Sequence, residues 1–445
     1  MSNDDNVKKL KVKAGMISRT IQVDHLARVE GAGSVYIKTK DNKVEDVKLK
    51  IFEHPRFFEA LLKDREMWEA PDITARICGI CPVAYQMSSV HAIENALGVN
   101  IPDYIHQLRR LIYCGEWIES NTLHLYLLHA PDFLGYQDAI EMSKNHQDIL
   151  KKGLQLKKTG NEIIQLLGGR EIHPINVKIG GFYKLPTKAE ILELVEKLKR
   201  ARDYAYETVK WVNAFDFPSL ERPYECVALS HPDEYAMSVG RIASSAGLNI
   251  EVKDYDQHFE EYQVSYSTAL QSIIKNRGSY LVGPMARYNL NHKNLSKLVH
   301  ETIKEIGFET VCRNPFRSIV VRALEILYAC DEALRIIAAY DSEKRPAFVN
   351  VEKKKAVGYG ATEAPRGLLY HRYTLNEKGV IEHAKIVPPT SQNQKSIEED
   401  LHDFVSQNIS MPDQELVWKC EQAIRNYDPC ISCSAHFLKI VRIDG

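Results

Sequence analysis

The sequence predicts a mainly α-helical protein with a small N-terminal β-sheet, an α+β fold class. Apolar and polar residues alternate between residues 19 and 53, which is the two-residue period of strands. Most later segments instead repeat apolar residues every three to four positions, as amphipathic helices do. Internal repeats, low-complexity tracts and long linkers are not found, so we expect one intertwined domain over residues 1–445.

The β-rich part covers residues 19–53. Asp41-Asn42 is a two-residue turn signal between two alternating runs, which predicts antiparallel pairing. The apolar members of the alternation are Ile21, Val23, Val35, Ile37, Val44, Val47, Leu49 and Ile51.

A helical body is predicted over residues 56–350. Pro82 opens one helix and Gly98 closes it, the usual places of proline and glycine at helix ends. The run from Ile105 to Leu128 has helical periodicity and is rich in leucine and tyrosine, which indicates a buried central helix.

Two more helices are expected in this body. Thr187 and Glu190 have the spacing of a capping box, and one apolar face continues from there to Val212. The other helix is expected between Asn314 and Tyr340.

The last part, residues 351–445, is richer in glycine and proline from 355 to 395, which predicts loops and short strands. A final helix around Leu416–Tyr427 should stop at Asp428-Pro429.

Composition excludes several function classes. Lys plus Arg number 58 against 59 Asp plus Glu, so no overall field attracts nucleic acid or an anionic membrane. The polar N-terminus lacks the apolar core of a secretory signal. Because no stretch has the roughly 18 uninterrupted apolar residues of a membrane span, we expect a soluble protein without direct membrane insertion.

Nine cysteines without an export signal favour reduced thiols over a disulfide framework. Five are scattered in apolar, helical neighbourhoods and are expected to be buried structural thiols: Cys114, Cys226, Cys312, Cys330 and Cys420. The other four form two Cys-x-x-Cys pairs, Cys78 with Cys81 and Cys430 with Cys433.

This spacing lets both sulfurs of a pair face one metal. Four soft thiolates suit tetrahedral zinc, an iron-sulfur cluster, or nickel and iron together, and the spacing does not choose among them. A single pair also fits a redox dithiol, but two pairs some 350 residues apart favour one site assembled by folding. Both pairs lie beside proline at helix ends, where free N–H groups stabilise thiolates.

Both motifs resemble the signatures of nickel-iron hydrogenase large subunits. Arg76–Pro82 reads RICGICP and Asp428–His436 reads DPCISCSAH. Further similarity lies in ARVEG (27–31), PRFFE (55–59), ESNTLHLYLLHAPDF (119–133), HPINVKIGG (173–181), EAPRG (363–367) and VPPTSQN (387–393). The detail is most similar to the cytoplasmic, NAD(P)-linked, sulfhydrogenase-like branch. The resemblance implies that family's fold, with a central bundle of long helices, and reversible conversion of H2 to protons and electrons.

The resemblance also implies a metal centre. Cys78 and Cys430 would be terminal nickel ligands, and Cys81 and Cys433 would bridge nickel and iron. The iron would also hold carbon monoxide and cyanide. Residues expected to surround those ligands are Arg366, Thr390 and Pro365.

Other roles follow from the same resemblance. Glu30 would relay the proton from Cys430, because heterolytic cleavage of H2 requires a base. Glu59 and His436 would hold Mg2+ or Fe2+ near the C-terminus, since oxygen and imidazole ligands suit these ions. Asp132 and Asp428 would lie next to the ligands.

Two features depart from the family pattern. Tyr85 stands four positions after Cys81, where the family usually has histidine, which affects the usual hydrogen bond to a bridging thiolate. The chain also continues past His436 with residues 437–445, a tail that a maturation endopeptidase would remove after nickel insertion.

Electrons must leave through other proteins, because no third cysteine cluster is present. The resemblance implies an iron-sulfur small subunit that carries the Fe-S clusters, and further Fe-S or flavin subunits that bind NAD or NADP. The chain has no dinucleotide-binding glycine motif of its own. Two alternatives stay open: a metal-free subunit of the quinone-reductase type and a structural zinc protein.

Overall fold

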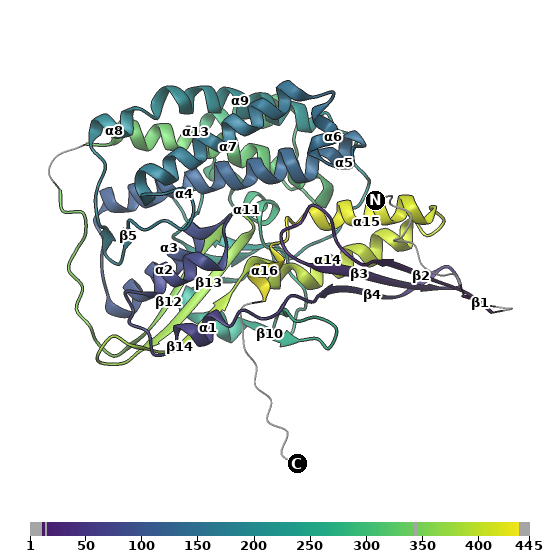
Figure 1. Cartoon of the computed structure of the whole chain (residues 1–445), viewed down its shortest axis with the longest axis horizontal. Coiled ribbons are helices and arrows are strands. Elements are labelled where there is room, and N and C mark those ends of the chain that lie inside the picture. The colour runs from purple at the N-terminus through teal and green to yellow at the C-terminus, as the bar shows by residue number, and fades with distance from the viewer. Residues whose placement is uncertain (1–10, 14–15, 342–344, 436–445) are drawn as a thin grey trace, which may run out of the picture.

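Long helices gather on one side of the molecule and small sheets on the other (Figure 1). The structure is a computed structural model that describes residues 11–13, 16–341 and 345–435. The sheets within this part of the chain are antiparallel and have two to four strands. The mainly α class with small sheets is therefore confirmed.

The predicted N-terminal sheet is present, with strand order β1-β2-β3-β4. Asp41 and Asn42 both have positive φ, 50° and 57°, as a tight hairpin turn requires. Along β3, buried and half-buried residues alternate, and Val35 and Ile37 point into the core. The strands are β1 (Lys11–Lys13), β2 (Met16–Val23), β3 (Gly33–Lys40) and β4 (Lys43–Ile51).

A layer of long helices forms the upper part of Figure 1: α4 (Asp103–Leu123), α7 (Gln147–Gly168), α9 (Val195–Asn213) and α13 (Ser318–Ala339). The predicted helix from 105 to 128 is confirmed in α4, but its regular α-helical part ends at Leu123. A π-helical turn, His124–His129, continues it. Such turns are rare and occur often at functional sites.

Beneath this layer, α3 (Pro82–Leu97) packs against β12 and β13, the two long strands of a second sheet. Its predicted ends are confirmed: Pro82 occupies the first turn, and Gly98 takes a left-handed conformation with φ 68°. The first cysteine pair therefore lies at the buried start of this helix.

The predicted capping box is also confirmed. Thr187 Oγ1 accepts the N–H of Glu190, and the Glu190 carboxylate accepts the N–H of Thr187. The helix that it opens, α8 (Lys188–Leu192), is short, and α9 begins only at Val195. The single continuous helical face predicted to Val212 is thus divided between two helices.

The glycine-rich segment after residue 355 is more regular than predicted. It forms β12 (Ala356–Ala364), β13 (Gly367–Leu375) and β14 (Ile381–Val387), followed by helix α14 (Pro389–Gln407). The glycines of β12 serve close packing, because a Cβ on Gly358 or Gly360 would lie 1.9 or 2.4 Å from a carbonyl oxygen of α3. The prediction of loops is therefore wrong for most of this segment, which consists of strands and a helix.

The remaining elements are short or peripheral. The helices are α1 (Phe58–Leu62), α2 (Ala70–Thr74), α5 (Ala130–Leu134), α6 (Ala139–Ser143), α10 (Tyr255–His258), α11 (Pro284–Asn291), α12 (Lys297–Glu305), α15 (Asp413–Arg425) and α16 (Ile431–Ser434). The strands are β5 (Val177–Lys178), β6 (Gly181–Phe182), β7 (Val227–Ser230), β8 (Arg241–Ser244), β9 (Asn249–Ile250), β10 (Phe259–Gln263) and β11 (Leu270–Ile274).

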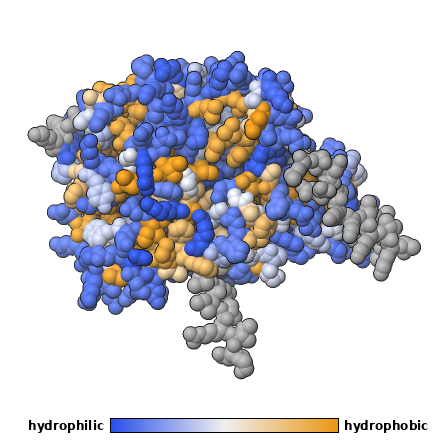
Figure 2. Space-filling view, viewed as in Figure 1, coloured by the Kyte–Doolittle hydropathy of each residue, from blue (hydrophilic) through white to orange (hydrophobic). Residues whose placement is uncertain are grey.

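Polar residues cover much of the face seen in Figure 2, with apolar patches between them. Among the described helices, none has both the length and the apolar character needed to cross a bilayer. Inside, one large apolar cluster extends from Ile21 in β2 to Cys433 in α16, so segments from both ends of the chain share one core.

Candidate metal centre

The first cysteine pair is held in a tight turn before α3. Cys78 follows a 3-10 turn, Ala75–Ile77, and Cys81 is the residue that precedes the first turn of α3. The N–H groups of Ile80 and Cys81 donate to Cys78 Sγ at 3.4 and 3.1 Å. Both side chains are buried, so the sulfurs lie in a site shielded from water.

The second pair flanks the short helix α16, with Cys430 just before it and Cys433 inside it. Both are buried, and in the structure they are linked to each other as a disulfide. The expectation of reduced thiols is wrong for this pair, whereas the other seven cysteines are free thiols. Binding of one metal by both sulfurs requires thiolates, so the metal-loaded form has this bond reduced.

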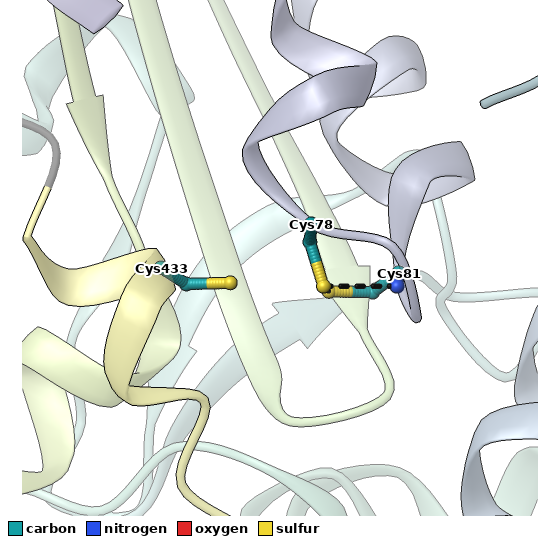
Figure 3. Close-up of side chains that lie close together, drawn as sticks. All are labelled: Cys78, Cys81 and Cys433. Atoms are coloured by element: carbon teal, nitrogen blue, oxygen red, sulfur yellow. Dashed lines mark hydrogen bonds between the residues drawn. The ribbon is translucent and has the colours of Figure 1, made fainter. Parts of the chain in front are cut away.

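Folding brings the two pairs together. Cys78 Sγ lies 2.8 Å from Cys81 Sγ and 3.8 Å from Cys430 Sγ. The sulfurs of Cys78, Cys81 and Cys433 all lie within 4.8 Å of one another, and Figure 3 shows Cys433 pointing from α16 toward the first pair. Such a cluster of soft donors fits a thiophilic metal.

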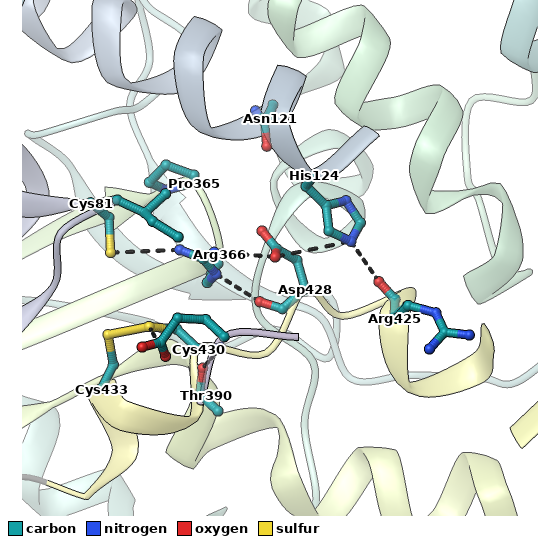
Figure 4. A network of polar contacts seen from close by, with 12 residues as sticks. Cys81, Asn121, His124, Pro365, Arg366, Thr390, Arg425, Asp428, Cys430 and Cys433 are labelled. Carbon is teal, nitrogen blue, oxygen red and sulfur yellow. Dashed lines mark hydrogen bonds and ion pairs between the residues drawn. A yellow bond between two sulfur atoms is a disulfide. The ribbon is translucent and has the colours of Figure 1, made fainter. Parts of the chain in front are cut away.

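Arg366, in the turn between β12 and β13, contacts both motifs. Its Nη1 donates to Cys81 Sγ at 3.7 Å, and its Nε and Nη2 donate to the carbonyl and carboxylate of Asp428 at 2.7 and 3.2 Å (Figure 4). Burial alone would lower the pKa of Arg366, but Asp428 and the two thiols raise it. A permanent positive charge therefore lies beside the sulfurs.

Two further predicted residues lie next to this arginine and the second pair. Thr390 Oγ1, in the first turn of α14, accepts the N–H of Cys430 at 3.0 Å. The carbonyl of Pro365 accepts a hydrogen bond from buried Arg287 of α11 at 2.9 Å, which fixes the turn that carries Arg366.

Glu30 reaches the second pair from the opposite end of the chain. Its Oε2 accepts the N–H of Ser432 at 3.1 Å and lies at the same distance from Cys430 Sγ, which can donate to it once the disulfide is reduced. The next residue, Gly31, has φ 90°, and a Cβ there would lie 2.8 Å from Ile431 Cβ. Glycine at this position therefore allows the close approach that places the carboxylate on the thiol.

The two predicted aspartates lie in different places. Asp428 pairs with Arg366, as described above, and its carboxylate also lies 4.0 Å from His124 Nε2. Asp132 instead pairs with Arg28 and Arg425, and the structure gives it no contact with a cysteine of either pair. It joins the loop of Glu30 to helix α15.

Tyr85 is buried in α3, and its ring lies 6.0 Å from that of His371 in β13. Its hydroxyl makes no hydrogen bond with any described residue. Burial raises the pKa of this phenol well above its usual value, and the neighbouring Cys81 and Cys78 raise it further. The hydroxyl therefore stays protonated and can act as a donor.

Glu59 lies in α1 beside β14, where its Oε1 accepts the N–H of Ile386 at 2.7 Å. Burial raises the pKa of Glu59 to about 7. His436, its predicted partner, and the tail 437–445 lie outside the described residues. The chain does return to this region, because the N–H of Arg56 donates to the carbonyl of Ala435 at 2.6 Å.

Sequence reasoning missed two side chains that hold the motifs in place. Glu116 of α4 is fully buried, and its carboxylate accepts the N–H groups of Val83 and Ala84, just after Cys81. Arg56 donates to the carbonyls of Ile77 and Ser432, one from each motif. Glu116 is a charged residue within the apolar run of a central helix, and this unusual position could have marked it as a functional residue in the sequence.

Fold and site together place a buried cluster of cysteine sulfurs, assembled from both ends of one chain, that fits a thiophilic metal. The chain belongs to the nickel-dependent hydrogenase family, whose model matches residues 56–152 and 253–436. It is accordingly the large subunit of a hydrogenase, an oxidoreductase that acts on H2. The four cysteines, with the disulfide of the second pair reduced, and the charged donor beside them fit such a centre.

Relatives and solved structures agree. Sulfhydrogenase 2 subunit alpha of Pyrococcus furiosus is 34% identical over 433 residues, covering 94% of this chain and 100% of the relative. The NAD-reducing hydrogenase HoxS subunit beta of Cupriavidus necator is 27% identical, with 95% and 96% covered. A crystal structure of an NAD+-reducing [NiFe]-hydrogenase in the H2-reduced state superposes with a TM-score of 0.86 at 26% identity, covering 94% of this chain and 99% of the other.

Proposed function

We propose that this subunit converts H2 reversibly to protons and electrons at a nickel-iron centre held by the two cysteine pairs. All four cysteines would hold the centre, Cys78 and Cys430 as ligands of nickel alone and Cys81 and Cys433 as ligands of both nickel and iron. The convergence of these sulfurs on Glu30 and Arg366 carries the proposal, because it supplies a base at one thiol and a fixed cation at another.

Glu30 is the proton acceptor. The centre, when bound, supplies heterolytic cleavage of H2. Cys430 Sγ takes up the proton and passes it to Glu30 Oε2, which lies 3.1 Å away and can exchange it with groups nearer the surface. The second hydrogen bond, from the N–H of Ser432, keeps that oxygen aimed at the sulfur.

Arg366, Pro365 and Thr390 would surround the iron, whose remaining ligands would be carbon monoxide and cyanide. A guanidinium and a hydroxyl are hydrogen-bond donors, which cyanide requires, and Pro365 is the apolar wall. Asp428 orients Arg366 through two hydrogen bonds. Tyr85, with its unpaired hydroxyl, is a donor toward a bridging thiolate.

Glu59 and His436 hold Mg2+ or Fe2+ in a structural role. The raised pKa of Glu59 supports this, because a nearby divalent cation would stabilise the carboxylate that burial destabilises. The contact between Arg56 and Ala435 supports it too, since it brings the chain before His436 to the region of Glu59.

Electrons leave through an iron-sulfur small subunit and then flavin or further Fe-S subunits to NADP or NAD. The relatives named for sulfhydrogenase and NAD reduction support this acceptor class. We further infer a cytoplasmic complex, a single intertwined domain, and removal of residues 437–445 by a maturation endopeptidase. The shared core of the two chain ends supports the single domain.

Glu30→Gln in the purified complex tests the central role. Glutamine keeps the shape but cannot take a proton, so turnover and hydrogen-deuterium exchange should fall by roughly 10²- to 10⁴-fold while nickel and iron contents stay unchanged. Glu53→Gln is a matched control, because the Glu53 carboxylate accepts the N–H of Ala32 in the same region. Near-normal exchange in the Glu30 variant with full metal content would reject the relay.

A further inference from the structure

Arg322 of α13 is a buried guanidinium with few partners. Its side chain is fully buried, and its Nη1 donates to Asn121 Oδ1 at 3.1 Å. Its Nε and Nη2 make no hydrogen bond with any described residue. The nearest paired carboxylate oxygen, Asp428 Oδ2, lies 3.8 Å away, beyond hydrogen-bond distance. Two donors of a buried cation are therefore unsatisfied, which is unfavourable in a packed interior.

Arg287 of α11 shows how a buried arginine is usually paired. It is equally buried, yet its guanidinium donates to both oxygens of Glu325, to Glu363 and to the carbonyls of Ala364 and Pro365. The protein thus supplies a full set of acceptors for one buried arginine and leaves the other short. Arg322 needs an acceptor beyond those that the described residues offer.

A cavity of ≈ 20 Å³ lies against Arg322, large enough for one water molecule, which needs about 10–15 Å³. Its polar lining is Arg322, Asn426 and Ser318, and the rest is mostly apolar. Among the residues that the structure describes, the side-chain amide of Asn426 has no hydrogen-bond partner at either its N or its O atom. Its backbone carbonyl accepts from Ser318 Oγ at 3.0 Å, which fixes the residue at the cavity.

We propose that a buried water held by Arg322 and Asn426 occupies this cavity, and that Arg322 is thereby a positioning residue for the metal centre. The water accepts one hydrogen bond from each of the unpaired nitrogens Nε and Nη2, so the cation stays against Asp428 Oδ2 while Arg366 holds Oδ1 of the same carboxylate. Asp428 then lies between two arginines, and the distance from Arg366 to Cys81 depends on both.

Burial lowers the pKa of Arg322 to about 10, so the side chain is still cationic near neutral pH. If the charge at Arg322 is removed, the Asp428 carboxylate interacts with Arg366 alone. The guanidinium of Arg366 is then drawn toward Asp428 and away from the sulfur it contacts at 3.7 Å. This consequence rests on the proposed function, in which Arg366 faces the iron ligands. The prediction of a bound water does not depend on that function.

The first experiment is a crystal structure of the native complex at a resolution that shows ordered water. We expect one water within hydrogen-bond distance of Arg322 and the Asn426 amide. An empty cavity, or an Arg322 side chain that finds protein acceptors instead, would overturn the proposal. This outcome is independent of whether the protein is a hydrogenase.

The second experiment compares Arg322→Met with Arg322→Lys by infrared spectroscopy of the iron-ligand bands. The methionine variant should shift those bands and lower turnover by roughly 10- to 100-fold at full nickel content, and lysine should restore both in part. Arg335→Met is the matched control, since Arg335 pairs with Glu332 on the same helix but is largely exposed. Its bands should not move.

Unshifted bands in a fully metallated Arg322→Met complex would overturn the role of Arg322. If that variant does not take up nickel, Asn426→Ala decides the question, because it removes the water's second partner and keeps the cation; unchanged bands there count equally against the proposal. Absence of iron-ligand bands in the mature wild type would instead reject the proposed function.

Discussion

Tyr85 and Tyr113 provide a matched pair of buried phenols at the residue scale. Both rings are fully packed near the first cysteine pair. The hydroxyl of Tyr113 donates to Thr362 Oγ1 at 2.8 Å, whereas that of Tyr85 has no partner among the described residues. The free energy of unfolding should therefore respond differently to loss of each hydroxyl, because a satisfied buried group stabilises and an unsatisfied one does not.

In the metal-free protein, Tyr85→Phe should leave the free energy of unfolding unchanged or raise it by up to about 1 kcal/mol, and Tyr113→Phe should lower it by about 1 kcal/mol. Urea denaturation of both variants and the wild type measures this. A loss for Tyr85→Phe as large as that for Tyr113→Phe would show that the Tyr85 hydroxyl has a protein partner after all.

Residue identity at the site was predictable from the two motifs, but the contacts were not. Glu30 and Cys430 are 400 positions apart, and no local spacing indicates that they meet. Asp132 illustrates the reverse, because its motif match predicted a place next to the ligands and the structure places it in an ion pair with Arg28 and Arg425. The need of Arg322 for an outside acceptor appears only when its whole surroundings are known.

Helix α14 holds the segment before the second cysteine pair at two points. Thr390 in its first turn accepts the N–H of Cys430, and Asp400 near its middle accepts the hydroxyl of Tyr427. Asp400 is fully buried and also accepts from Arg222 and Tyr224. This element therefore fixes residues 427–430 from one side.

Asp400→Asn should lower the free energy of unfolding by about 1–3 kcal/mol, since it weakens charge-assisted hydrogen bonds in a buried network. It should also lower nickel retention, because Tyr427 leads directly into the second motif. Glu399→Gln is the control on the same helix, because the Glu399 side chain is partly exposed and forms an ion pair with Arg222 at the protein surface. Denaturation and metal analysis check both effects, and an Asp400 variant as stable as the control would show that α14 does not brace the motif.

Helix α3, with its end signals at Pro82 and Gly98, and helix α13 were predictable, whereas α14 was not. Its first residues, Pro389 to Asn393, are polar or proline, a composition typical of a loop. They are nevertheless buried, and Gln392 and Asn393 accept hydrogen bonds from neighbouring chain segments. In β12, glycines read as turn residues, although close packing against α3 is what requires them. In both segments, tertiary contacts rather than local sequence determine the secondary structure.

At the scale of the whole molecule, the proposed metal centre lies where segments from both ends of the chain meet. Strand-loop residues near position 30, the turn before α3 and the last described helix meet in one core. A chain truncated before Cys430 would lose two of the proposed metal ligands and the contacts of Glu30 at once. This arrangement links completion of the fold to completion of the site.

The most direct test of the central claim is an infrared spectrum of the anaerobically purified native complex, with its small subunit and a trimmed C-terminus. The account predicts bands of iron-bound carbon monoxide and cyanide that shift when H2 is added. Absence of such bands from that mature complex, with zinc or no metal in place of nickel, would contradict it.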